Sequence, residues 1–277
     1  MDKKALKRVL DGLPLGAIRY YETIGSTNLE ALEWVKNGAP DLAAVIADEQ
    51  TLGYGRRGRR WYTPKGEALA LSLIIHPTLT ESRLSAPTRA GVSLMPRLTA
   101  LGALAVADTL QDEYKLDANI KWPNDVLVNG YKLAGILVEA LWLGEILAAA
   151  VIGIGVNVRV GSIPAGVTLD SPTNCLENLL NEPVDRVALL GQILKNLLFW
   201  RTRIFTDSFL KRWEKSLAYL DEWVTFMRDQ VPSGEDSFTA QILGLGPDGA
   251  LRILMQDGSA KTLLESEFRI RPSDDKQ

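Results

Sequence analysis

Short apolar runs along the first 160 residues indicate a sheet with helices packed against it. These runs are rich in valine, isoleucine, leucine and alanine, and glycine, proline or asparagine bound them, which is the pattern of buried strands. A mixed sheet with helices on one face accounts for this order of elements. The strands are expected at residues 16–25, 43–49, 68–75, 119–128, 132–142 and 146–158.

Longer segments with an apolar stripe predict helices. In the helix expected at residues 26–38, Thr27 and Glu30 have the spacing of a capping box, and Asn37-Gly38 is a stop signal. The other helices are expected within residues 1–17, along 86–112 with closure near Tyr114, near 172–180 and along 184–216.

The pattern changes after about residue 220, where short alternating runs are separated by turn signals such as Asp257-Gly258. Such a series of short strands is typical of a small β-barrel. The fold class is therefore predicted to be α+β, with a mixed sheet followed by a small C-terminal barrel. We expect two domains, residues 1–218 and 219–277.

Composition excludes several classes of protein. The chain has 277 residues, of which 46% are hydrophobic and 23% charged, as in a soluble protein with a sizeable core. The chain has a single cysteine, which excludes an internal disulfide. One cysteine and one histidine in total are too few ligands for a zinc site. The N-terminus is too polar for a signal peptide and no apolar stretch is long enough to span a membrane, so we expect a cytoplasmic protein.

The loop GYGRRGRRW, from Gly53 to Trp61, concentrates four arginines in a protein whose net charge is -3 and whose pI is about 5.4. A general binder of nucleic acids would spread positive charge over a whole face. Arginine grips carboxylate and phosphate groups with two parallel hydrogen bonds, and glycine lets the backbone turn its N–H groups toward an anion. The loop therefore predicts a multiply anionic small ligand, although an ordinary solvated basic loop has the same composition.

Three further segments carry candidate chemistry. Ser26-Thr27-Asn28 opens a helix and can either bind a polar head group or only cap that helix. In KWPNDV, proline at a strand edge holds Lys121 in place, although Lys121 taken alone can also be a surface charge. GIGVNV, from Gly153 to Val158, permits a close approach of ligand to strand, but it lacks the third glycine of a dinucleotide fingerprint.

Two carboxylates remain unassigned at this point. Asp125 and Glu139 can pair with Lys121 or with Lys132, or can assist a magnesium ion. The only histidine, His76, closes an apolar run and is expected at a strand end, without a role in a catalytic triad.

Taken in order, STN, the strand ending in EQ, the arginine loop, KWPNDV, KLAGILVE and GIGVN resemble the biotin protein ligase family. The resemblance covers about residues 20–160, and the C-terminal β region agrees with the terminal barrel of that family. It implies a core like that of class II synthetases, followed by an SH3-like barrel. It also implies a ligase that converts biotin and ATP, with Mg²⁺, to biotinyl-5′-AMP and transfers biotin to a lysine of a biotin carboxyl carrier protein.

The resemblance also implies roles for individual residues. Lys121 and Arg56 are expected to be catalytic. No metal-binding residues are expected, because Mg²⁺ is expected to accompany ATP. Biotin is expected to contact Ser26, Thr27, Asn28, Gln50, Gly53, Tyr54, Gly55, Arg56 and Lys121. ATP and the adenylate are expected to contact Arg56, Arg57, Arg59, Trp61, Lys121 and Asn157.

Two departures from the family qualify these expectations. Tyr54 stands where the usual GRGRRG loop has arginine, and only about 20 residues precede the first core strand, so we expect no DNA-binding domain. A homodimer is consistent with the family, and GIGVNVRV is a possible pairing edge. The alternatives are a lipoate or octanoate ligase or transferase of the same superfamily, or a ligand-binding module without catalytic activity.

Overall fold

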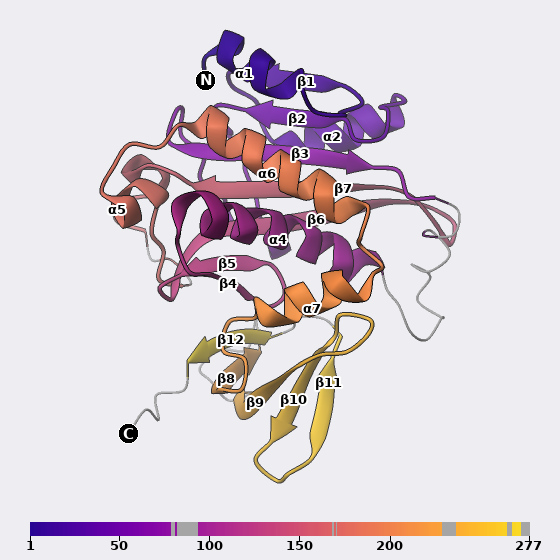
Figure 1. The fold of residues 1–277 in the computed structure, drawn as a ribbon, viewed down its shortest axis with the longest axis vertical. Helices are drawn as coiled ribbons and strands as arrows, with labels where there is room; N and C mark the ends of the chain where they lie inside the picture. Colours follow the sequence, from indigo (N-terminus) through magenta and orange to yellow (C-terminus); the bar gives the residue numbers. More distant parts are fainter. Residues whose placement is uncertain are drawn as a thin grey trace.

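The structure, a computed structural model, describes residues 1–78, 81, 94–167, 169, 171–228, 237–264 and 268–272. Its main body is a seven-stranded sheet in the order β1-β2-β3-β7-β6-β5-β4, in which β1 and β2 are parallel and all other neighbours are antiparallel (Figure 1). The strands are β1 (Ile18–Tyr21), β2 (Ala44–Ala47), β3 (Ala68–Ile75), β4 (Ala118–Lys121), β5 (Asp125–Val128), β6 (Tyr131–Leu143) and β7 (Ile146–Asn157).

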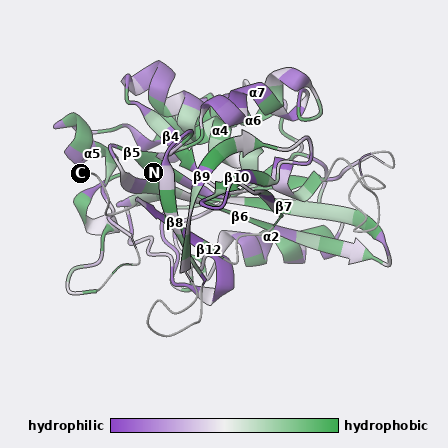
Figure 2. Cartoon of the chain, turned by 90° about the horizontal axis from the view of Figure 1, so that it is seen from below, coloured by the Kyte–Doolittle hydropathy of each residue, from purple (hydrophilic) through white to green (hydrophobic). Residues whose placement is uncertain are grey.

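Helices cover both faces of this sheet. The helices of the main body are α1 (Lys3–Leu10), α2 (Thr27–Lys36), α4 (Leu94–Tyr114), α5 (Leu176–Leu180), α6 (Arg186–Arg201) and α7 (Asp207–Lys215). Two views agree that α4 and α6 lie on one side of the sheet and α2 on the other (Figure 1 and Figure 2). The expected start of the long helix near residue 86 lies outside the described residues, and the stretch at 184–216 is two helices, α6 and α7.

The inner strands β2 and β3 are buried along their whole length because each face is covered. Ile46 of β2 packs into the larger core, which also contains α4, whereas Val45 packs with Ala31 and Val35 of α2. The α+β class is therefore confirmed. The expectation of helices on one face only is wrong for α2, which buries a smaller apolar cluster on the opposite side.

The second sheet contains five antiparallel strands in the order β11-β10-β9-β8-β12. They are β8 (Trp223–Arg228), β9 (Ser237–Leu245), β10 (Leu251–Met255), β11 (Ala260–Leu263) and β12 (Phe268–Pro272). The Trp122 indole N–H donates to the Gly249 carbonyl at 3.2 Å, which ties the β4–β5 turn to this sheet. That residues 1–218 and 219–277 form separate domains stays a prediction.

The expected pairing edge at GIGVNVRV is wrong. In β7, Gly155 pairs with Ala70 of β3 on one side and with Gly135 of β6 on the other, so this part of the strand has no open edge. The outer strands of the sheet are β1 and β4. In the described residues, no helix combines the length and apolar character that a membrane crossing requires.

Candidate active site

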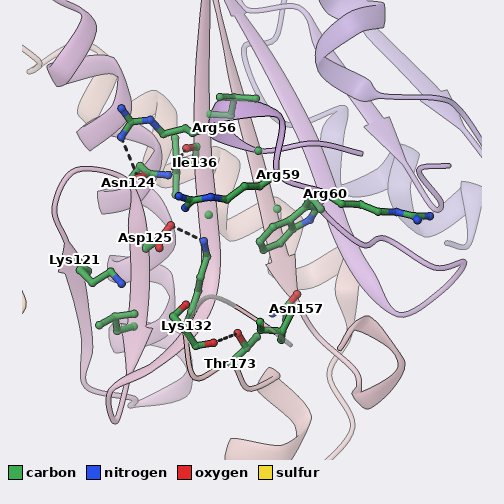
Figure 3. Close-up of a pocket in the computed structure, with 18 of the residues that line it drawn as sticks. Arg56, Arg59, Arg60, Lys121, Asn124, Asp125, Lys132, Ile136, Asn157 and Thr173 are labelled. Atoms are coloured by element: carbon green, nitrogen blue, oxygen red, sulfur yellow. Dashed lines mark hydrogen bonds and ion pairs between the residues drawn. The ribbon is translucent and has the colours of Figure 1, made fainter. Parts of the chain in front are cut away.

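A pocket of about 980 Å³ lies at one end of the seven-stranded sheet, where segments far apart in the sequence meet. Its walls come from the N-terminus of α2, the arginine loop, the β4–β5 turn, the first half of β6, the C-terminal part of β7, the segment that follows β7, and β12. Figure 3 shows side chains from several of these segments converging on Asp125 and Lys132. A volume of this size accommodates a ligand of several hundred daltons.

Almost every residue singled out in the sequence reaches this pocket. The lining includes Ser26, Thr27, Asn28, Gln50, Tyr54, Gly55, Arg56, Arg57, Arg59, Trp61, Lys121 and Asn157. Of the residues expected to contact biotin or ATP, Gly53 is the exception, because it stands in the stem of the loop, where its carbonyl accepts from the Trp61 N–H at 2.9 Å. Convergence on one pocket is thus established for these residues, while their individual roles stay predictions.

The polar end of the pocket is built at the start of α2. Ser26 is the N-cap, not Thr27, so the expected capping box is wrong; Glu30 instead accepts from Arg19 and Tyr21. Thr27 is therefore turned inward, where its N–H donates to the Gln50 side-chain oxygen at 2.8 Å.

The Gln50 amide nitrogen donates in turn to Thr63 Oγ1 at 3.1 Å. A buried set of hydroxyl and amide groups with fixed orientations suits a ligand that both donates and accepts hydrogen bonds.

The arginine loop folds back on itself as a short hairpin. The Gly55 N–H donates to the Arg59 carbonyl at 2.7 Å, and the turn between them is a 3₁₀ segment, Arg56–Gly58. Arg57 adopts φ of +58° and Gly58 φ of +71°, a left-handed pair that reverses the chain. Arg56 and Arg59 extend from this turn toward Asn124 and Asp125, whereas Arg60 extends away from Asp125 and the lysines (Figure 3).

Arg56 joins the loop to the KWPND segment. Its Nη1 donates to Asn124 Oδ1 at 3.4 Å, and the Asn124 amide nitrogen donates to the Ile136 carbonyl on β6 at 3.0 Å. The asparagine of KWPND thus links one arginine of the loop to the sheet. Arg56 is placed over the part of the pocket that also holds Asp125 and Lys132 (Figure 3).

Lys132 is a pocket residue to which the sequence analysis assigned no role of its own. Its Nζ lies 2.7 Å from Asp125 Oδ1, and the two side chains are 22% and 15% exposed. The same ammonium lies 5.7 Å from the centre of the Trp61 ring. Of the two carboxylates left open above, Asp125 therefore pairs with Lys132. The lysine of KLAGIL carried the signal, but it was considered only as a possible partner of Asp125 or Glu139.

Lys121 also lines the pocket, where its surroundings disfavour the protonated, charged form of its amine. Burial is the main reason that the pKa of Lys121 lies below the ordinary value for lysine; Asp125 opposes this shift, and the cations Lys132, Arg271 and Arg269 add smaller effects that lower the pKa. Among the described carboxylates none forms an ion pair with Lys121. An anion that enters the pocket would therefore relieve repulsion at this position.

The C-terminal sheet contributes cations that sequence reasoning missed. Arg269 and Arg271 of β12 line the pocket, although the sequence FRIRP was assigned only to the barrel. Two arginines separated by one residue project from the same face of a strand, and this spacing was the available signal. The anion-binding side of the pocket thus draws on both sheets.

The glycines of GIGVNV make room for two side chains rather than contacting a ligand alone. A Cβ on Gly155 would lie 2.3 Å from Cε2 of Trp61, and a Cβ on Gly153 would lie 2.2 Å from Oδ1 of Asn28. The Trp61 ring therefore lies directly against the backbone of β7. Next to Gly155, Asn157 donates from its amide to the Asn174 carbonyl at 3.4 Å. His76 lies outside this lining, and its ring contacts the Ala39 carbonyl.

Comparison with known proteins identifies the family. Residues 20–157 match the model of the biotin/lipoate A/B protein ligase family. The bifunctional ligase/repressor BirA of Bacillus spizizenii is 32% identical over 87% of this chain and 70% of its own length. The biotin–[acetyl-CoA-carboxylase] ligase of Paracoccus denitrificans is 34% identical over 66% of this chain and 72% of its own length.

Among solved structures, the biotin protein ligase from Aquifex aeolicus in complex with biotin and ATP is similar, with a TM-score of 0.73 and 26% identity, covering 93% of this chain and 99% of that one. The segments that resemble the family in sequence are those that line the pocket described above. The chain belongs to the biotin/lipoate A/B protein ligase family.

Proposed function

We propose that this protein activates biotin with ATP and transfers it to a lysine of a biotin carboxyl carrier protein. The observation that carries the proposal is the pairing, in one pocket, of a polar end at Thr27 and Gln50 with a cluster of cations that includes Lys121 and Lys132. A neutral hydrogen-bonding head group and an anionic reacting centre fit these two ends. Relatives named as biotin ligases, and the similar Aquifex structure with biotin and ATP, support it.

In the first step, a carboxylate oxygen of biotin attacks the α-phosphorus of ATP. A new carboxyl–phosphate bond forms, the bond from the α-phosphorus to the bridging oxygen breaks, and pyrophosphate leaves. Because two anions must approach each other, fixed positive charge is the main requirement of the site. We assign that charge to Lys132, Lys121 and Arg56, with Arg57, Arg59 and the arginines of β12 directed at the phosphates.

The adenine ring of ATP is proposed to lie against Trp61, close to Asn157 on β7. Mg²⁺ is proposed to enter with ATP as part of that substrate. In the described ranges, no three His, Cys, Asp or Glu side chains are grouped so that they could hold a metal ion, and Asp125 already pairs with Lys132. On the phosphates, the ion would neutralise the pyrophosphate as it leaves.

In the second step, the neutral amine of the acceptor lysine attacks the carbonyl carbon of the mixed anhydride. The bond to the AMP oxygen breaks, an amide forms, and the nitrogen loses its proton. The same cations stabilise the departing AMP. Covering of the pocket by the arginine loop and β12 would limit hydrolysis of the anhydride by water.

The proposal is tested by measuring pyrophosphate release from ATP with biotin, lipoate and octanoate side by side. Of the three acids, we expect only biotin to cause release of pyrophosphate from ATP. In addition, mass spectrometry of a biotin carboxyl carrier domain incubated with the enzyme, biotin and ATP should show one biotin on one lysine. Release of pyrophosphate with lipoate or octanoate but not with biotin would indicate a lipoate or octanoate ligase instead. Absence of release with all three would contradict a ligase function.

Gly155→Ala is expected to raise the KM for ATP by about tenfold or more while changing the KM for biotin little. The added methyl group would overlap the Trp61 ring, which must then leave the backbone of β7. Steady-state kinetics in both substrates measures this. Gly12→Ala is the matched control, because a Cβ there meets no atom within 4 Å. A folded Gly155→Ala protein with the wild-type KM for ATP would contradict an adenine site at Trp61.

A further inference from the structure

Tyr54 does not direct its side chain at the cations of the pocket. Its hydroxyl donates to Glu139 Oε2 at 2.7 Å, and Glu139 lies on β6. The carboxylate that remained unassigned in the sequence is therefore the partner of the residue that departs from the family pattern. This contact attaches the first half of the arginine loop to the central sheet.

The same carboxylate oxygen also holds Asn28. The Asn28 amide nitrogen donates to Glu139 Oε2 at 2.8 Å, and its amide oxygen accepts from the buried Ser72 hydroxyl at 2.6 Å. With a donor and an acceptor both satisfied, only one orientation of the amide fits. Gly153 leaves the space that this amide occupies. Glu139 Oε2 is thus the point where the loop, α2 and β6 meet.

Ser72 extends the network to the polar end of the pocket. Its hydroxyl also lies 2.8 Å from Thr27 Oγ1, and the Thr27 backbone N–H donates a hydrogen bond to the Gln50 side-chain oxygen. If the Glu139 carboxylate moved, Asn28 would lose its partner, and the positions of Ser72 and then Thr27 would change in turn. Chains of buried hydrogen bonds behave as units, because the loss of one partner leaves the next one unsatisfied.

We propose that Tyr54 is a positioning residue for biotin, which acts by donating to Glu139 and thereby fixes both the arginine loop and the Asn28 amide at the head-group end of the pocket. This inference rests on the proposed function, since it assigns that end of the pocket to biotin. It predicts an effect on biotin affinity rather than on the chemical step, because the contacts of the Tyr54 hydroxyl, with Glu139 and beside it with Ser26, lead to the polar end.

The phenol suits this role because it remains a donor. Burial, and next the hydrogen bond to Glu139, raise the pKa of Tyr54 above its usual value, so the hydroxyl keeps its proton throughout the neutral and moderately alkaline range. Arginine at this position also donates to a carboxylate. Tyr54→Arg should therefore preserve the contact, whereas Tyr54→Phe removes it and keeps the ring.

Tyr54→Phe is expected to raise the KM for biotin about tenfold, with kcat within about twofold of wild type and the KM for ATP unchanged. Tyr21→Phe is the matched control: the Tyr21 hydroxyl also donates to a glutamate, Glu30, at 2.7 Å, but outside the pocket. It should leave all three constants at their wild-type values. Tyr54→Arg should keep the KM for biotin within about threefold of wild type.

A double-mutant cycle with Glu139→Ala tests the route of the effect. If Tyr54 acts through Glu139, the double variant should have the same KM for biotin as Glu139→Ala alone. Additive effects, or an unchanged KM for biotin in Tyr54→Phe, would overturn the inference. The proposed function fails separately: wild-type enzyme that releases no pyrophosphate with biotin would exclude it whatever the variants do.

Discussion

Replacing Lys132 with alanine is expected to slow biotin-dependent pyrophosphate release by about 10²–10³-fold. Its ammonium is held by Asp125 at 2.7 Å and lies beside the Trp61 ring, so it is fixed where the carboxylate of biotin and the α-phosphate of ATP would meet. A charge placed in advance stabilises the transition state without reorganisation during the reaction. Single-turnover formation of biotinyl-AMP, measured with saturating substrates, reports this step directly.

One complication is built into that variant, because it leaves the Asp125 carboxylate without its partner. An orphaned buried charge can disturb a pocket by itself. The double variant Lys132→Ala/Asp125→Asn removes both charges and should remain as slow as the single variant. Recovery of the rate in the double variant would contradict a direct role of Lys132. Lys7→Ala is the control outside the pocket, because Lys7 of α1 also forms an ion pair with an aspartate, Asp11.

Lys121→Ala is expected to lower the same rate by about 10²-fold and to leave the fold intact, because it removes the second fixed cation of the reacting centre. The pKa of Lys121 supplies a sharper readout. Only the protonated ammonium attracts anions, and its pKa is lowered chiefly by burial. The charge is therefore complete at low pH and is lost as the pH rises through a value below that of ordinary lysine.

In wild-type enzyme, kcat/KM for biotin should consequently fall on the alkaline side before an exposed lysine would lose its proton. Lys121→Arg keeps a cation that does not titrate in this range, so its alkaline decline should move to higher pH. The pH profile of kcat/KM, measured for both proteins, checks this shift. An alkaline decline at the same pH in both would show that another group is responsible.

The parts of the fold that could be predicted are those fixed by local pattern. β3 has the expected bounds because a continuous apolar run with both faces covered has few alternatives. The side of the sheet on which α2 packs could not be predicted, because periodicity shows that a helix has an apolar face but not which layer receives it. The misplaced cap at Thr27 has a similar origin: two adjacent hydroxyl residues both satisfy the local pattern.

The candidate site shows the same division. Its motif residues could be found from the sequence, because glycine, arginine and KWPND have chemistry that is visible one segment at a time. Lys132 could not be separated from a buried strand without the register of β6, which places it opposite Leu127 of β5. The meeting of Tyr54 with Glu139 depends on a contact between residues 85 positions apart. No local rule predicts such a pair.

Because β12 contributes to the pocket, the pocket can be completed only late in the synthesis of the chain. The lining runs from Ser26 to Pro272, so a ribosome has translated nearly every described residue before the set of cations around Lys121 is complete. A chain that terminates before Arg269 lacks two of the charges that lower the pKa of Lys121. Such a fragment would present a more basic lysine and a weaker anion site, so the anion-binding half of the pocket is assembled last.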